Sequence, residues 1–253
     1  MKSLKLGAFV LALAAATPSQ ALTSPATMFD LSHFKLTLPV NSTGGTTGTA
    51  ATIRTKELVG YPGYASEYFQ TGALGTLEFF SPTNGATTSG SSSSHTRSEL
   101  RELYTATGPT EWTNRIGGTL TATCRIRQAS VNSDEAVIGQ IHGLSSILVL
   151  IDYNPRKQQV EAKVYSSPSN SQTTVYPMKT NVAIGDRIAY SVQWIGSTLS
   201  VTVNGATRNW TTASNWNNVP VYFKLGAYSS APNTGNPASD ATKVSFERFY
   251  VQH

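Results

Sequence analysis

Alternation of apolar with polar or small residues dominates the chain after residue 70. Between residues 188 and 194, for example, Ile188, Tyr190, Val192 and Trp194 are separated by small or polar side chains. A period of two is typical of strands with one buried face. The pattern predicts strands at 119–126, 147–152, 158–165, 188–194, 199–203, 221–228 and 243–251.

Turn residues separate these runs. Ile195-Gly196-Ser197 joins two of them into a hairpin, and Asn204-Gly205 follows the second run directly. Asn-Gly favours the two-residue turn in which both central residues have positive φ, so a third strand should begin near Ala206. Helix should be minor, with a turn or two near 66–69 and 213–216.

Many short strands without long helical periodicity favour antiparallel sheets over βαβ units. We therefore expect an all-β fold, a jelly-roll β-sandwich of two curved antiparallel sheets with a concave groove on one face. Residues 41–52 and 87–96 consist largely of small polar residues, which we expect to form mobile loops.

The first 21 residues predict a secretory signal peptide. They begin with Lys2 and Lys5, continue through an apolar run, and end with small residues, and the run is too short to span a bilayer. We therefore expect residues 22–253 to form a single secreted, extracellular domain with no membrane association. One cysteine, Cys124, lies in an alternating segment and is expected to be a buried core residue.

Charge favours an anionic partner. The formal net charge of +5 falls to about +3 without the signal peptide, because Lys2 and Lys5 are lost. No basic run or nucleic-acid reader motif is present, so we expect no nucleic-acid partner. Nothing in the sequence requires more than a monomer.

Three segments place polar residues at every second position, so that these side chains share one face of a strand. If the apolar residues between them pack in the core, the polar faces together form a cationic groove with titratable groups. The three sets are Arg97, Glu99 and Arg101; Gln140 and His142; and Tyr222, Lys224 and Tyr228.

Such a groove suits β-elimination on a polyuronate. Removal of the C5 proton places charge on the adjacent carboxylate, which arginine and glutamine donors would stabilise. A histidine or tyrosine could take the proton, and a tyrosine could protonate the departing O4, so no metal and no organic cofactor is needed. Other chemistries fit less well: Glu99 and Glu102 fall on opposite faces of a strand, which excludes them as a glycosidase pair, and the chain has no Gly-x-Ser-x-Gly and no closely spaced histidines.

The three motifs, with residues 31–39 and 80–85 in support, resemble the alginate lyases of polysaccharide lyase family 7. The resemblance covers nearly the whole mature chain and implies a β-jelly roll that cleaves alginate, endo-acting, to 4,5-unsaturated uronate ends. One departure is Ser229-Ser230, where the family commonly continues Asn-Gln after the last tyrosine.

The resemblance also implies roles for the polar residues. Arg97 and Gln140 would neutralise the substrate carboxylate, His142 would assist or act as base for one uronate epimer, and Tyr228 would act as general acid, or also as base in syn elimination. The remaining residues would bind or orient the substrate: Glu99, Arg101, Lys224 and Tyr222. Two alternatives remain, a lyase for another polyuronate such as glucuronan and a noncatalytic carbohydrate-binding sandwich.

Overall fold

The computed structural model describes residues 22–88, 95–105, 107–169, 172–233 and 235–253. The predicted signal peptide, residues 1–21, and much of the predicted loop at 87–96 lie outside these ranges. Among the described residues, no helix is both long and apolar enough to cross a membrane.

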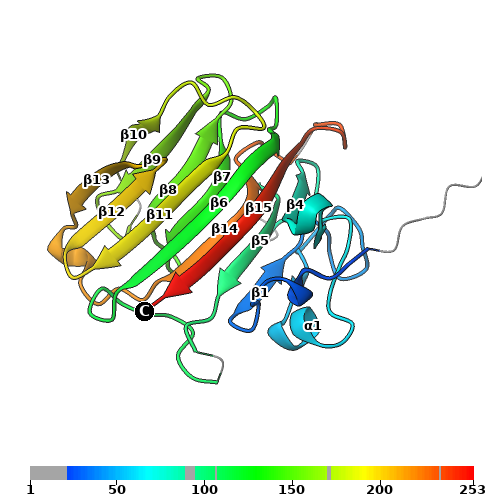
Figure 1. Ribbon diagram of the computed structural model, residues 1–253, viewed down its shortest axis with the longest axis horizontal. Coiled ribbons are helices and arrows are strands. Elements are labelled where there is room, and N and C mark those ends of the chain that lie inside the picture. Colours follow the sequence, from blue (N-terminus) through cyan, green and yellow to red (C-terminus); the bar gives the residue numbers. More distant parts are fainter. Residues whose placement is uncertain (1–21, 89–94, 106, 170–171, 234) are drawn as a thin grey trace, which may run out of the picture.

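Two antiparallel sheets stacked face to face make up this part of the chain (Figure 1). In spatial order, the eight-stranded sheet contains β10 (Thr173–Lys179), β9 (Gln159–Tyr165), β8 (Ile147–Asn154), β7 (Ala136–His142), β14 (Tyr222–Ser229), β5 (Arg97–Glu102), β1 (Phe34–Thr37) and β2 (Thr52–Ile53). The seven-stranded sheet contains β13 (Ala206–Thr211), β12 (Thr198–Val203), β11 (Ile188–Ile195), β6 (Gly118–Gln128), β15 (Ala241–Gln252), β4 (Leu77–Pro82) and β3 (Phe69–Thr71). The predicted all-β sandwich is confirmed.

Helix is confined to short pieces: η1 (Pro25–Thr27), α1 (Thr55–Val59), η2 (Ala73–Gly75) and η3 (Ser214–Trp216). The turn predicted near 213–216 corresponds to η3. The helix predicted near 66–69 is wrong, because Ser66 and Phe69 exchange backbone hydrogen bonds of 2.8 and 3.0 Å and lead into strand β3. This bridge uses the amide groups that a helical turn would need.

The core lies between the sheets and is rich in large rings. Trp112, Trp194 and Trp216 are fully buried there, and the rings of Phe79 and Phe246 meet edge to face at 5.5 Å. Cys124 is also fully buried, as predicted, and burial raises the pKa of its thiol. Burial of this much apolar surface drives the two sheets together.

The predicted hairpins are present. β11 pairs with β12, and β12 pairs with β13 across Asn204 and Gly205, whose φ angles are 47° and 86°. Both central residues thus have the positive φ expected of this turn. The edge strand β10 and the helix α1 were not predicted. The first is mostly exposed and lacks apolar alternation, and the second is too short to show helical periodicity.

Candidate active site

Three neighbouring strands of the eight-stranded sheet carry the polar residues singled out in the sequence. β14 lies between β5 and β7, and all three turn their apolar residues, including Leu100, Ile141 and Leu225, into the core. The polar residues therefore face outward together. Cross-strand register pairs Arg97 with Tyr228, Arg101 with Lys224, Lys224 with Gln140, and Tyr222 with His142.

Gly226 interrupts the row of side chains on β14, opposite Glu99. Its φ is +156°, and a Cβ there would lie 2.4 Å from the Ser98 carbonyl oxygen and 2.7 Å from Glu99 Cα. Any other residue would push β14 away from β5. The missing side chain leaves room over Glu99, between Lys224 and Tyr228.

Glu99 lies at the centre of the charged cluster and is 1% exposed. Its carboxylate accepts a hydrogen bond from Gln140 Nε2 and forms an ion pair with Lys224 Nζ, and Arg97 Nη1 lies 3.7 Å from Oε2. Burial alone would raise the pKa of this carboxyl, but the charges of Lys224 and Arg97 outweigh it and hold the pKa below its ordinary value. Glu99 is thus an anion that ties the three donors together.

Lys224 is buried beside Glu99 and close to two other cations, Arg97 and Arg101. Burial is the main reason that its pKa falls to about 8, with Arg97 and Arg101 adding to the effect and Glu99 opposing it. Near neutral pH the ammonium group is therefore still mostly charged, but it loses its proton at a pH well below that of an ordinary lysine.

The Tyr228 ring lies between two partners. The Arg97 guanidinium carbon is 4.3 Å from the ring centroid, and the His95 ring meets Tyr228 edge to face at 6.0 Å. Burial raises the pKa of the Tyr228 phenol, although the charge of Arg97 opposes this. The hydroxyl is therefore protonated at neutral pH and can donate a proton to a departing oxygen.

His142 ends strand β7 with its imidazole largely buried. Its Nδ1 contacts the Gly143 carbonyl oxygen, so Nδ1 carries the proton and Nε2 keeps its lone pair. Burial, with the charge of Lys224, lowers the pKa of His142 to about 4. The ring is neutral at physiological pH and can accept a proton at Nε2.

Arg101, Tyr222 and His142 are stacked in that order. The Arg101 guanidinium carbon lies 3.8 Å from the Tyr222 centroid, and the Tyr222 and His142 rings are stacked at 5.6 Å. The Tyr222 hydroxyl donates to the Gly143 carbonyl at 3.0 Å, and Arg101 also pairs with Glu111. These contacts fix the orientation of the imidazole.

A groove of about 890 Å³ lies over these strands. Four cationic side chains line it, against the carboxylate of Glu111, which also lines it, and that of Glu99, which is buried beside Lys224. The cations are Lys35, Arg97, Arg101 and Lys224. A site with this excess of positive charge attracts a polyanion.

All eight predicted site residues therefore lie on one face of the sheet, and the other seven are arranged around Glu99. Two groove residues were not predicted: Lys35, although the burial of β1 alternates from residue to residue, and Glu111, which lies in a loop with no distinguishing pattern. Glu102, by contrast, lies on the core side, where it accepts hydrogen bonds from Trp112 Nε1 and the Phe223 amide. The exclusion of a Glu99–Glu102 pair is thus confirmed.

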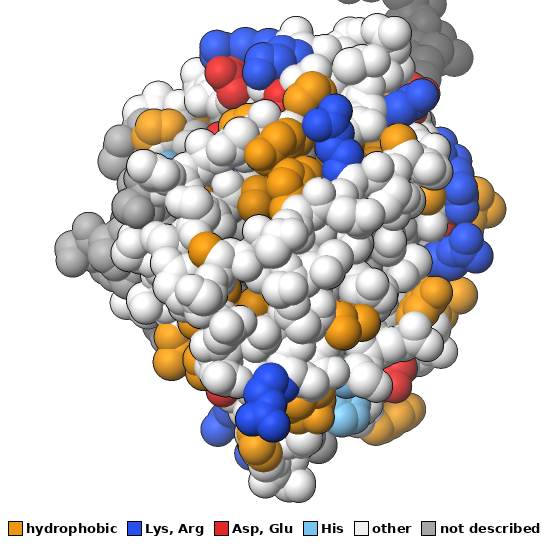
Figure 2. All heavy atoms as spheres, turned by 90° about the vertical axis from the view of Figure 1, so that its left-hand side faces the viewer, with side chains coloured by type: hydrophobic (Ala, Val, Ile, Leu, Met, Phe, Trp, Pro, Cys, Tyr) orange, Lys and Arg blue, Asp and Glu red, His pale blue; other side chains and the backbone are white. Residues whose placement is uncertain are grey.

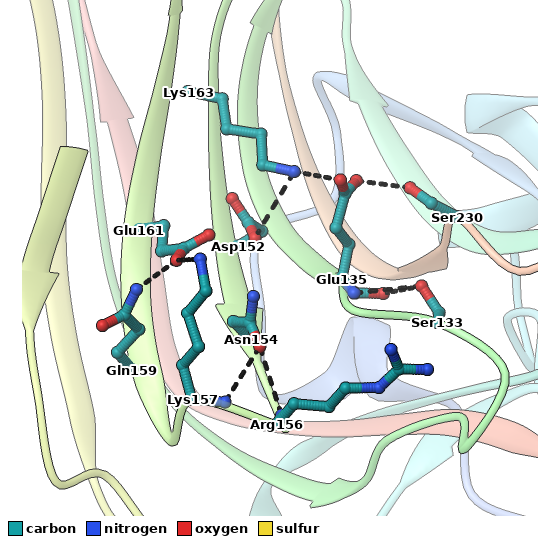
Figure 3. A network of polar contacts seen from close by, with 10 residues as sticks. All are labelled: Ser133, Glu135, Asp152, Asn154, Arg156, Lys157, Gln159, Glu161, Lys163 and Ser230. Atoms are coloured by element: carbon teal, nitrogen blue, oxygen red, sulfur yellow. Dashed lines mark hydrogen bonds and ion pairs between the residues drawn. The ribbon is translucent and has the colours of Figure 1, made fainter. Parts of the chain in front are cut away.

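A second polar network adjoins the groove at the end of β14 (Figure 3). Ser230 Oγ donates to Glu135, which also pairs with Lys163, and Lys163 Nζ lies 4.0 Å from Asp152. Ser230, which replaces the glutamine common in the family, therefore uses its hydroxyl in a hydrogen bond within the protein. Among the described residues, no group of three or more histidine, cysteine or acidic side chains is arranged to hold a metal ion.

The arrangement can bind a carboxylate-bearing chain and move protons on it. Arg97 and Lys224 supply positive charge, Tyr228 supplies an acidic hydroxyl, and the neutral His142 supplies a base. A buried, preorganised set of donors stabilises developing negative charge far better than water does.

The chain is similar to known proteins in both sequence and structure. A family model described as alginate lyase matches residues 29–253. Alginate lyase PA1167 from Pseudomonas aeruginosa is 31% identical, with a TM-score of 0.78 over 88% of this chain and 99% of that one. No curated protein sequence matches the chain significantly.

Two further solved structures are similar. Alginate lyase A1-II′, described as a member of polysaccharide lyase family 7, is 26% identical, with a TM-score of 0.78 over 90% of this chain and 98% of that one. A double variant of A1-II′ in complex with a substrate written GGMG is 25% identical, with a TM-score of 0.79 over 92% of this chain and 97% of that one. The sandwich described above is thus the jelly roll of these enzymes.

Proposed function

The chain belongs to the alginate lyase family, and from this premise we propose that it cleaves alginate by β-elimination, as a polysaccharide lyase of family 7. The observation that carries the proposal is the convergence of Arg97, Gln140, His142 and Tyr228 on one outward face around Glu99. A carboxylate clamp, a neutral base and a protonated phenol are what this elimination needs.

The first step concerns the substrate carboxylate. With the uronate carboxylate at Arg97 and Gln140, its charge is neutralised and the C5 proton becomes more acidic. Glu99 holds Gln140, and its ion pair with Arg97 holds the guanidinium in place, so both donors are oriented before the substrate arrives. Little reorganisation is then needed in the transition state.

The second step is the transfer of protons. Nε2 of His142 takes the C5 proton, the C5–H electrons form the C4=C5 double bond, and the C4–O4 bond breaks. The Tyr228 hydroxyl gives its proton to O4, so that the leaving sugar departs as an alcohol. Exchange with solvent then restores the two residues. For the uronate epimer whose C5 proton faces Tyr228, the hydroxyl gives its proton to O4 while the phenolate oxygen so formed takes the C5 proton, so the tyrosine ends in its starting protonation state.

The biological setting follows from the same proposal. A groove open over several strands suits endo-acting cleavage within a long chain, and the predicted signal peptide suits a secreted, extracellular, monomeric enzyme that meets its polysaccharide outside the cell. No cofactor takes part in the steps proposed.

The test is absorbance near 235 nm, the region expected for a conjugated unsaturated uronate, after purified protein is mixed with alginate, poly-mannuronate, poly-guluronate or glucuronan. We expect a rise with alginate and with at least one of its two block polymers. A rise with glucuronan alone would assign a different polyuronate. Binding to all four without any rise would identify a noncatalytic carbohydrate-binding sandwich.

A further inference from the structure

The edge strands β10 and β13 belong to different sheets but lie at the same end of the sandwich, away from β1 (Figure 1). Most of their residues are exposed. Hydrophobic side chains are visible close to lysine or arginine side chains on this side of the molecule (Figure 2). Neither strand lines the catalytic groove.

Two aromatic side chains meet where these edges approach each other. Tyr176 of β10 and Trp210 of β13 lie with ring centroids 5.0 Å apart and an interplanar angle of 54°. Both rings remain partly exposed, and they line a cavity of about 200 Å³ together with Tyr165 and Thr174. The cavity therefore has aromatic walls open to solvent.

A cation accompanies the rings. The Arg208 guanidinium carbon lies 5.8 Å from the Tyr176 centroid, and the residue is exposed. It forms no ion pair with any residue in the described part of the chain. Its donors are thus available to an anionic ligand beside two apolar ring surfaces.

We propose that Tyr176, Trp210 and Arg208 form a second polysaccharide-binding site, which holds one uronate unit of the chain outside the catalytic groove. The C–H face of a pyranose ring matches an aromatic surface, and a uronate adds a carboxylate that Arg208 can bind through paired hydrogen bonds. A neutral sugar would use only the first contact. The choice of a uronate rests on the proposed function.

The distance between this site and the catalytic groove determines which substrates can occupy both. β10 is three strands from β7, which carries His142, and four from β14, which carries Tyr228, and strands about 4.8 Å apart make these separations about 14 and about 19 Å. A polymer can reach both sites, whereas a trisaccharide in the groove cannot. The second site would keep a long substrate attached between cleavages by raising its effective concentration.

Trp210 provides a direct measurement, because the chain has four tryptophans and the other three are fully buried. We would titrate the Tyr228→Phe protein, which keeps the ligand intact, with alginate trisaccharide and follow tryptophan fluorescence. We expect a saturable change that is lost when Trp210→Phe is added. A neutral glucose trisaccharide should bind much more weakly.

Matched variants separate ligand binding from structure. Arg208→Gln should weaken the Trp210-dependent binding roughly fivefold or more, and Tyr176→Ala should weaken it similarly. Arg127→Gln, which removes an exposed arginine of β6 in the seven-stranded sheet, should leave it unchanged. In the active enzyme, Arg208→Gln should lower kcat/KM on polymeric alginate but not on the trisaccharide. Melting temperatures close to that of the parent protein show that the fold is retained.

The proposal is overturned if no saturable change occurs, if the change persists without Trp210, or if Arg208→Gln binds as tightly as the parent protein. These results are independent of catalysis. A protein that gives no absorbance at 235 nm can still show Trp210-dependent uronate binding, and an active lyase can lack it. Failure of the second site and failure of the proposed function are therefore distinguishable.

Discussion

The Arg97 guanidinium lies over the face of the Tyr228 ring, with its carbon 4.3 Å from the ring centroid. The two residues are cross-strand partners on β5 and β14, so the sheet itself holds the carboxylate-binding group against the proton donor. A ring in this position retains the cation–π contact even without its hydroxyl. The hydroxyl can therefore be removed with little effect on the fold.

Tyr228→Phe should reduce turnover on alginate about a hundredfold or more, because the departing O4 loses its proton donor while the ring still packs on Arg97. The rate of absorbance increase at 235 nm measures the loss, and a melting curve checks the fold. Tyr250→Phe, at a tyrosine that is 50% exposed, is the matched control and should leave the rate unchanged. Full turnover by Tyr228→Phe would rule out its role as the acid.

Arg97→Ala and Gln140→Ala should each lower kcat about a hundredfold or more, because the carboxylate charge that grows during C5 deprotonation loses a donor. Glu99 keeps Lys224 as a partner in either variant, so we expect both proteins to fold. Steady-state kinetics on alginate and circular dichroism provide the two measurements. Arg127→Ala is the control for loss of a cationic side chain. Near-normal kcat in a folded Arg97→Ala or Gln140→Ala protein would contradict carboxylate neutralisation.

His142→Ala should affect the two uronates differently. The pKa of about 4 leaves His142 neutral, so it can serve as base where the C5 proton faces its Nε2, whereas Tyr228 serves the other epimer. Parallel assays on poly-guluronate and poly-mannuronate test this, and we expect a selective loss on poly-guluronate. An equal loss on both polymers would instead indicate that His142 binds the carboxylate.

Lys224 should produce a decline in kcat/KM as the pH rises through about 8, because its folded-state pKa lies there and the groove loses a positive charge above it. The pH profile of the wild-type enzyme, compared with that of Lys224→Arg, checks the assignment. Arginine stays charged throughout this range, so the decline should move to higher pH. If both enzymes decline at the same pH, another group is responsible.

The sequence predicted which side chains share a face but not how the faces are assembled. A period of two places Arg97, Glu99 and Arg101 on one side of a strand whatever the fold. That β14 lies between β5 and β7 depends on pairings between residues 80 or more positions apart, which no local pattern encodes. The family resemblance supplied what local patterns could not.

The pKa values and the ring contacts of the site could not be predicted from the sequence either. The low pKa of His142 arises from burial and from the nearby Lys224, and the stacking of Arg101 on Tyr222 depends on register. The Tyr176–Trp210 pair requires two edge strands of different sheets to meet at one end of the sandwich. These properties come from long-range packing and become visible only in the folded structure.

Asp152→Asn should stabilise the protein, and by more as the pH rises. Asp152 is fully buried, and both of its carboxylate oxygens lack a hydrogen-bond partner among the described residues. Burial raises the pKa of this carboxyl well above its ordinary value, although the charge of Lys163 opposes the rise. Between the unfolded pKa near 4 and the raised folded pKa, the folded state binds one proton more than the unfolded state.

The wild type should therefore lose about 1.4 kcal/mol of stability relative to the variant for each pH unit in that window, and the difference should stop changing below about pH 4. Urea unfolding of both proteins at several pH values measures it. Asp134→Asn, at an exposed aspartate paired with Arg156, is the control and should show little such trend. A difference between wild type and Asp152→Asn that does not change with pH would mean that Asp152 is ionised in the folded protein, because only a carboxyl that stays protonated on folding couples unfolding to proton release.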